Sequence, residues 1–144
     1  MFEENVAATR RLFEEAWNQG NLDVIDELCA EDFVDHDPVM GDSDREGVKQ
    51  LVSGYRDAFP DLDITIEDTF ADDDKVVVRW VAQGTFENAI MGQEPTGERG
   101  DPINGIGIDR FEDGKVVESW GQWDTLTFMR NIGAMPAEAT AAAE

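Results

Sequence analysis

The sequence has few of the residues that form disulfides and metal sites. Its 144 residues contain one cysteine (Cys29) and one histidine (His36). A single cysteine excludes an internal disulfide and is typical of a reducing compartment, so we expect the protein in the cytoplasm. One histidine and one distant cysteine cannot supply the three or four ligands of a transition-metal site, so we expect no metal cofactor.

Long apolar runs are also missing. No stretch approaches the roughly 20 apolar residues that a membrane span needs. The chain starts with an acidic, amphipathic segment, MFEENVAATRRLFEEAW, which is unlike a secretory signal peptide. We therefore predict no association with membranes.

Positive charge is scarce. The chain has 11 Lys and Arg against 33 Asp and Glu, a net charge of −22. Such a surface repels phosphate groups, so neither nucleic acid nor anionic lipid is expected as a partner. The acidic excess, with only three lysines, favours an adaptation to molar salt, where a Debye length of about 3 Å screens self-repulsion. An ordinary acidic protein is the alternative.

The apolar pattern predicts one α+β domain at residues 1–135 and a flexible tail at 136–144. Apolar residues spaced by three and four predict three helices, at residues 2–17, 22–29 and 44–59. Alternating and β-branched runs predict strands at residues 62–69, 75–86, 103–111 and 116–124. Residues 87–102, rich in Gly and Pro, are interpreted as a loop or lid.

Long strands interrupted by glycines indicate a curved antiparallel sheet. Three N-terminal helices packed on such a sheet would form a cone that encloses a pocket.

Short segments spread over residues 5–133 carry a family resemblance. They include DHDP at 35–38, AFPDL at 58–62, DKVVVRW at 74–80, DGKVVE at 113–118 and DTL at 124–126. In order and spacing they resemble the SnoaL-like polyketide (ester) cyclases. The resemblance implies the nuclear transport factor 2-like fold and a homodimer formed through the outer sheet face, here through Val77, Arg79 and Val81.

The resemblance also implies a chemistry. Characterised cyclases close a ring by an intramolecular aldol reaction, without metal or organic cofactor. They use an aspartate near the end of the last long strand as acid/base, and Asp124 stands at the matching position. Two departures are Phe86 and Ser119, where the family often has histidine. They favour the alternative of a non-catalytic module that binds a hydrophobic metabolite, whereas Asp124 favours the enzyme.

Asp124 and His36 are the predicted catalytic residues. Strand alternation places Asp124 on the same face as Trp120 and Gln122. If that face points inward, desolvation would raise the pKa of Asp124 towards the range of a proton shuttle. A carboxylate that caps a backbone amide at the strand end is the alternative. His36 lies between two aspartates that would stabilise its protonated form, and a structural histidine at the pocket rim is its alternative.

The remaining candidates would line a pocket for a small hydrophobic carbonyl compound. They are Trp80, Trp120, Tyr55, Asn104, Gln122 and Phe59. Aromatic side chains form the walls of apolar pockets, while the Tyr55 hydroxyl, Asn104 and Gln122 would supply polar contacts. Core packing is the alternative for the aromatic residues, and it is favoured for Phe59.

Overall fold

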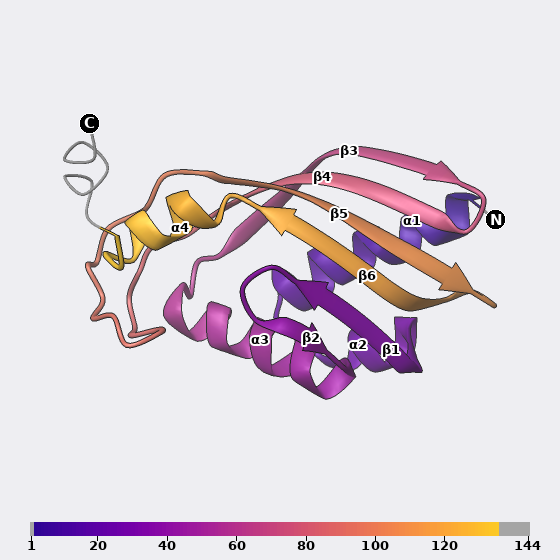
Figure 1. The fold of residues 1–144 in the computed structure, drawn as a ribbon, viewed down its shortest axis with the longest axis horizontal. Helices are drawn as coiled ribbons and strands as arrows, with labels where there is room; N and C mark the ends of the chain where they lie inside the picture. The colour runs from indigo at the N-terminus through magenta and orange to yellow at the C-terminus, as the bar shows by residue number, and fades with distance from the viewer. Residues whose placement is uncertain (1, 136–144) are drawn as a thin grey trace.

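In the computed structural model, which describes residues 2–135, helices pack against one six-stranded sheet (Figure 1). The helical elements are α1 (Phe2–Arg11), the π-helical segment η1 (Leu12–Trp17), α2 (Asp23–Leu28), α3 (Arg45–Ala58) and α4 (Thr125–Asn131). The strands are β1 (Cys29–Asp37), β2 (Gly41–Ser43), β3 (Asp63–Asp72), β4 (Lys75–Gln83), β5 (Ile103–Glu112) and β6 (Lys115–Trp123). The predicted α+β class is confirmed, and the predicted tail at 136–144 lies outside the described residues.

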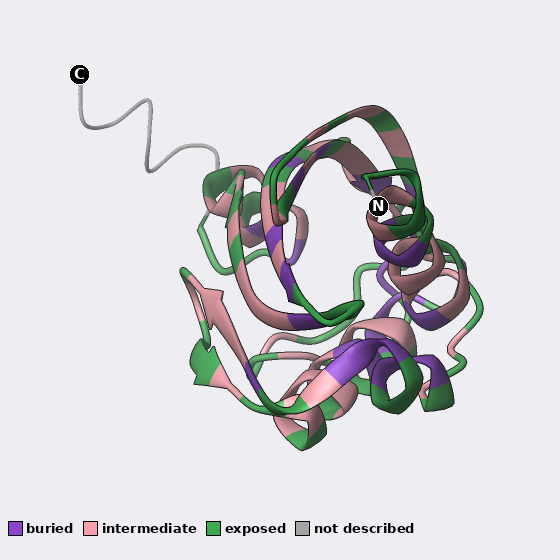
Figure 2. Ribbon diagram, turned by 90° about the vertical axis from the view of Figure 1, so that its right-hand side faces the viewer, coloured by how far each residue is buried: buried purple, intermediate pink, exposed green. Residues whose placement is uncertain are grey.

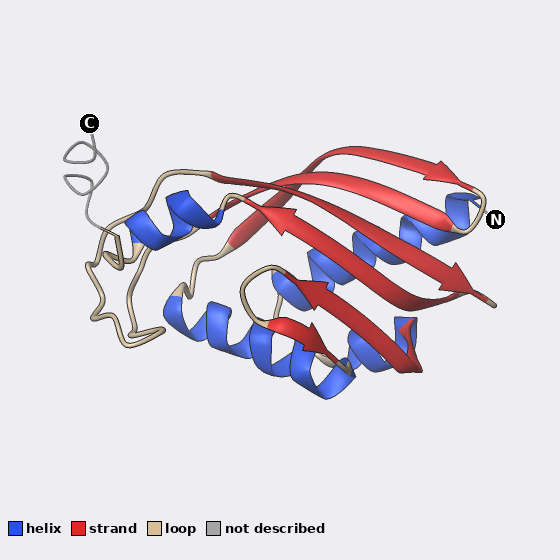
Figure 3. Cartoon of the chain, in the orientation of Figure 1, coloured by secondary structure: helices blue, strands red, loops and turns tan. Residues whose placement is uncertain are grey.

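The sheet has the order β2-β1-β6-β5-β4-β3 (Figure 3). It is mixed, because β1 runs parallel to β6 while the other neighbours are antiparallel. The sequence did not reveal β1 and β2. Residues 29–37 carry four acidic side chains and lack clean apolar alternation, and their partner β6 lies some 80 residues further on.

A β-bulge changes which side chains of β6 face inward. Arg110 pairs with Glu118 and Phe111 with Val116, so Val117 is an extra residue on β6. Val116 is fully buried inside, yet beyond the bulge the inward positions are Ser119, Gly121 and Trp123. Strand alternation counted from Val116 therefore fails before it reaches the end of the strand.

The sheet curls around the first helices (Figure 2). α1 and η1 lie against β3 and β4, and α3 lies against β1, so the helices cover the concave face. α3 begins where Asp44 accepts a hydrogen bond from the Gly47 amide at 2.8 Å. It ends before Pro60, which cannot continue a helix.

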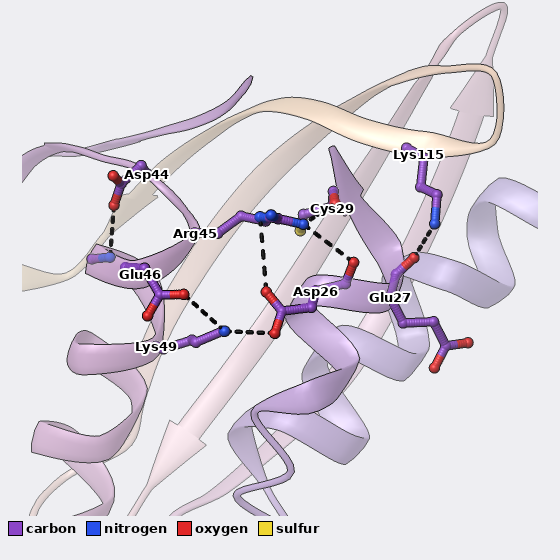
Figure 4. Close-up of polar contacts among 9 residues, drawn as sticks. Asp26, Glu27, Cys29, Asp44, Arg45, Glu46, Lys49 and Lys115 are labelled. Atoms are coloured by element: carbon purple, nitrogen blue, oxygen red, sulfur yellow. Dashed lines mark hydrogen bonds and ion pairs between the residues drawn. The ribbon is translucent and has the colours of Figure 1, made fainter. Parts of the chain in front are cut away.

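The few basic side chains tie the short helix α2 to its neighbours (Figure 4). Arg45 donates to the carbonyl oxygens of Asp26 and Cys29, and Lys115 donates to the carbonyl oxygen of Glu27. These cations satisfy carbonyls at the C-terminal end of α2, where positive charge is favourable. Lys49 joins α3 to α2 through Asp26 at 2.6 Å.

Two apolar clusters form the core. One packs α2 and α3 against the sheet and includes Val52, Val76 and Val116, and the other gathers Phe59, Phe86, Phe128 and Ile132 near α4. Within residues 2–135, no helix is long and apolar enough to cross a membrane.

Candidate functional site

A cavity of about 230 Å³ lies between the concave sheet face and the helices. Its walls are mostly apolar, with Phe13 and Trp17 from η1, Leu51 from α3, and Val78 and Trp80 from β4. The cavity borders both core clusters, so it is the space that the curved sheet and the helices leave unfilled.

Four aspartates, Asp35, Asp37, Asp101 and Asp109, interrupt this apolar lining, and Asp101 is the exposed one among them. Asp109 on β5 is buried and accepts hydrogen bonds from Thr9 Oγ1 at 2.8 Å and Ser119 Oγ at 2.6 Å. Desolvation raises the pKa of Asp109, and the two hydrogen bonds oppose that rise. Asp109 therefore links α1 to β5 and β6 and has two of its acceptor positions occupied.

Asp37, at the end of β1, is held by three donors. Its Oδ1 accepts from the amides of Val39 and Met40, both at 2.8 Å, and its Oδ2 accepts from Trp123 Nε1 at 3.3 Å. These contacts fix the turn between β1 and β2, so Asp37 has a structural task.

Asp35 differs from Asp37 and Asp109 in its lack of hydrogen-bond donors among the described residues. Its half-buried carboxyl lines the cavity, accepts no hydrogen bond and forms no ion pair with any residue in 2–135. Burial, and then the charges of Asp37 and Asp109, raise its pKa to about 7. Asp35 is thus the carboxyl in the cavity wall that is free to exchange a proton near neutral pH.

Tyr55 of α3 supplies a second unpaired polar group. Its Oη is buried and has no hydrogen-bond partner among the described residues. The ring is fixed between Trp17 and Phe128, with centroids at 5.9 and 5.8 Å. Burial and the charge of Asp37 raise its pKa to about 12, so Tyr55 is a neutral donor at physiological pH. A buried hydroxyl without a partner costs about 1–3 kcal/mol, which an acceptor brought by a ligand would recover.

The prediction that Asp124 faces inward and is desolvated is wrong. Its exposed carboxylate is the N-cap of α4 and accepts from Thr127 Oγ1 at 2.6 Å and from the Thr127 amide at 3.1 Å. These hydrogen bonds lower the pKa of Asp124, whereas a desolvated proton shuttle requires a raised one. The bulge at Val117 is the physical reason, because it puts the even-numbered residues beyond it on the outer face.

His36 also faces away from the cavity, because it alternates with Asp35 and Asp37 on β1. Its Nδ1 lies 2.7 Å from Asp42 Oδ1 and its Nε2 lies 2.8 Å from Glu118 Oε2. These contacts, Glu118 first, raise the pKa of His36. The ring stacks on Trp120, which borders the cavity but leaves 36% of its surface exposed.

The other predicted residues divide between the two faces. Trp80, Tyr55 and Phe59 line the cavity. Asn104 and Gln122 are exposed on the outer face, where they border a shallow groove beside Arg79. The expected inward orientation of Gln122 fails for the same reason as that of Asp124.

The two departures from the family pattern have clear structural tasks. Phe86 is buried and stacks on Phe59, with ring centroids 5.4 Å apart. Ser119 faces the cavity and donates to Asp109.

Sequence reasoning missed Asp35 and Asp109. The pattern DHD at 35–37 contained the signal, because alternation around His36 requires both aspartates to share the face opposite to the histidine. Within the described residues, no group of three or more His, Cys, Asp and Glu side chains is placed to hold a metal ion.

The family model described as SnoaL-like polyketide cyclase matches residues 7–132. No curated protein sequence matches the chain. AclR from Streptomyces galilaeus, a candidate hydroxylase, is 28% identical, with a TM-score of 0.83 over 94% of this chain and 100% of AclR.

Two further solved structures are similar. IdmH from Streptomyces antibioticus, a candidate polyketide cyclase, is 31% identical, with a TM-score of 0.76 over 90% of this chain and 98% of IdmH. A candidate SnoaL-like polyketide cyclase from Jannaschia sp. CCS1 is 26% identical, with a TM-score of 0.83 over 93% of this chain and 94% of that one. With a family match over residues 7–132 and this shared fold, the chain belongs to the SnoaL-like polyketide cyclase family.

Proposed function

We propose that this protein performs acid/base chemistry on a small hydrophobic carbonyl compound, in the manner of a polyketide cyclase. One observation carries the proposal: Asp35 presents a carboxyl without a partner among residues 2–135, with a pKa raised to about 7, to a mostly apolar cavity. A general base works best when its pKa lies near the operating pH.

The reaction follows from the groups in the wall. Ionised Asp35 takes a proton from the carbon next to a carbonyl, and the electron pair moves onto the carbonyl oxygen to give an enolate. Tyr55 Oη donates a hydrogen bond to that oxygen. The enolate carbon then attacks a second carbonyl of the same molecule, and the resulting alkoxide takes the proton back from Asp35. A carbon–carbon bond forms and no other reactant is needed.

Asp35 is preferred to the other acidic residues on the basis of their contacts. Asp37 and Asp109 are occupied by donors of the protein itself, and Asp101 is exposed to solvent. Asp124, the sequence candidate, is exposed and has a lowered pKa. Its catalytic role stays a prediction, and it serves as the comparison in the experiment below.

Exchange of α-protons tests the proposal without knowledge of the natural substrate. 2-Tetralone is a small apolar ketone with acidic α-protons, and their replacement by deuterium in D₂O is followed by NMR. We expect the wild-type protein to accelerate this exchange and Asp35→Asn to lower the rate by about 10²–10⁴-fold while folding normally. Asp124→Asn should keep most of the rate. The wild-type rate in Asp35→Asn would overturn the assignment.

A non-catalytic binding module is the second candidate. The observation that favours it is the use of Asp124, the residue expected to perform the chemistry, as a helix cap. In that case the wild-type protein would bind 2-tetralone but leave its exchange at the uncatalysed rate.

We further propose a homodimer formed through the outer sheet face, in the cytoplasm of a cell with high internal salt. Apolar side chains form a row across four strands of that face, Phe70, Val77, Ile108 and Trp120. Phe70 is 65% exposed, and no helix among residues 2–135 covers the row. Light scattering in 2 M salt tests the dimer, and a monomer mass would contradict it.

A further inference from the structure

The sheet presents three inward glycines at its centre. Gly105 and Gly107 lie on β5, and Gly121 on β6 pairs directly with Gly107. Ile106 and Ile108 alternate with these glycines and face outward. On this part of β5 the apolar side chains therefore lie on the outer face, whereas in most sheets they face the core. Glycine within a strand costs about 0.5–1 kcal/mol relative to alanine, so each of these positions needs a reason.

At residue 105, a contact within the protein explains why the residue is glycine. A Cβ built on it would lie 2.2 Å from Trp80 Cζ2, because the indole of Trp80 lies across the bare backbone. Any side chain at residue 105 would displace Trp80 from the cavity wall.

At residues 107 and 121, neither the backbone conformation nor a neighbouring side chain requires glycine. Neither has a positive φ, and the register shift of β5 and β6 lies elsewhere, between Arg110 and Phe111. A Cβ at Gly121 would meet no atom within 4 Å, and one at Gly107 would make ordinary contacts of 3.5 Å with Val78 Cγ1 and the Trp120 carbonyl. The chain therefore has room for side chains at both positions, and both border the cavity.

The space they leave is part of the site already described. Gly107 and Gly121 border the same cavity as Asp35 and Tyr55, and the buried Oη of Tyr55 has no partner among residues 2–135. Residues 2–135 supply no acceptor for this donor, and a ligand with a carbonyl oxygen would supply one.

We propose that Gly107 and Gly121 are specificity-determining residues, and that the ligand occupies the space that their missing side chains leave. This inference rests on the proposed function in one respect, namely that a small molecule binds in this cavity. The ligand packs directly against the backbone of the Gly107–Gly121 pair, as the indole of Trp80 packs against the backbone of Gly105. Side chains at these two positions set the largest ligand that enters.

The test compares a large and a small ketone. 9-Fluorenone has three flat rings and no α-proton, so it reports binding alone; cyclohexanone is the small probe. Gly121→Val should weaken fluorenone binding by at least about tenfold, as an overpacked site does, and leave cyclohexanone affinity within about threefold. Its melting temperature should hold or rise, because a β-branched residue replaces glycine in a strand.

Gly54→Val is the matched control. Gly54 lies on the exposed face of α3, where a Cβ would also meet nothing within 4 Å. Valine is no worse than glycine in a helix, so this variant should fold and bind both ketones as the wild type does. If Gly121→Val does not fold, Gly121→Ala, which adds only the Cβ, is measured instead, with a smaller loss in the same direction.

Three results would overturn the proposal: unchanged fluorenone affinity in the variant, an equal loss for both ketones, or no binding of fluorenone by the wild-type protein. The proposed function fails separately. If Gly121→Val excludes fluorenone while Asp35→Asn leaves the exchange of 2-tetralone unchanged, the specificity role stands and the acid/base role falls.

Discussion

Asp35 and Asp124 have the same side chain, yet their surroundings, the cavity wall for Asp35 and the start of α4 for Asp124, give them opposite properties. Asp35 faces the cavity without a partner, and burial raises its pKa to about 7. Asp124 is exposed at the start of α4, and two hydrogen bonds from Thr127 lower its pKa. Hydrogen bonds stabilise the ionised form of Asp124. The carboxyl of Asp35 has no such bonds from the described residues, and its raised pKa suits it to proton transfer near neutral pH.

The same contrast separates Asp35 from its neighbour His36. On one strand, residue 35 meets an apolar cavity, while residue 36 meets Asp42 and Glu118 on the outer face. A one-residue step along a strand therefore moves a side chain from the cavity to the outer face.

The largest expected effect concerns the pH dependence of exchange. Asp35 acts as a base only when ionised, so the rate of 2-tetralone exchange should rise about tenfold per pH unit at low pH and level off above about pH 7. The rate of the background reaction without protein is subtracted at each pH. A plateau already reached at pH 5 would contradict the assignment to Asp35 and move it to a carboxylate of ordinary pKa.

The second effect concerns stability. The folded pKa of Asp35 is raised to about 7, above the roughly 3.9 of an unfolded aspartate, so the folded state holds the extra proton between these values. The contribution of Asp35 to stability is present below about pH 4 and is lost as the pH rises through 7. Asp35→Asn has no such loss. Urea unfolding should show its advantage over the wild type growing between pH 4 and 8, and a constant difference would contradict the account.

The third effect is the opposite response of Asp124. Removing the cap with Asp124→Ala should cost about 1 kcal/mol of unfolding free energy at pH 7, because the Thr127 amide loses its acceptor. The lowered pKa means that this contribution is present above about pH 4 and is lost as the pH falls through the folded value. Asp124→Asn, which still accepts a hydrogen bond, should cost less. Equal stability of all three proteins in urea would refute the capping role.

A fourth, smaller effect separates exposed from enclosed charge. Salt between about 0.1 M and 2 M should raise the melting temperature, because it screens the repulsion within a chain of net charge −22. The pKa of Asp35 should move little, since buried groups are screened less. Calorimetry at several salt concentrations measures the first part, and a flat or falling melting temperature would argue against an adaptation to high salt.

The smallest effect concerns His36. Its raised pKa means that its ion pairs stabilise the fold below about pH 6.5 and that this contribution is lost as the pH rises through the folded value. The stability difference between the wild type and His36→Gln should therefore be larger at pH 5 than at pH 9. A difference that is the same at both pH values would indicate that the ring acts through its stacking on Trp120 alone.

Much of the fold could be predicted from the sequence. Amphipathic spacing located α3, and Pro60 gave its end within two residues. The Asp113-Gly114 pair placed the hairpin between β5 and β6, with a positive φ at both residues. These elements depend on local rules, which a single sequence contains.

The site was harder to predict because it depends on long-range pairing. The inward face of β6 follows from the bulge at Val117, which arises in the pairing with β5 and has no signal in the β6 residues themselves. The sequence pattern does not indicate α4, so strand alternation predicts Asp124 at the end of a strand, whereas it lies at the start of a helix. Asp35 belongs to the DHDP motif, but its orientation follows only once residues 29–37 are known to form a strand.

The most direct test is a titration of the aspartate carboxyl carbons by NMR, with Asp35→Asn and Asp124→Asn used to assign the two signals. We expect Asp35 to titrate near pH 7 and Asp124 below the roughly 3.9 of a free aspartate. An Asp35 carboxyl that titrates at or below pH 4 would contradict the account, because it would place the group in water or against a partner and remove the base from the cavity.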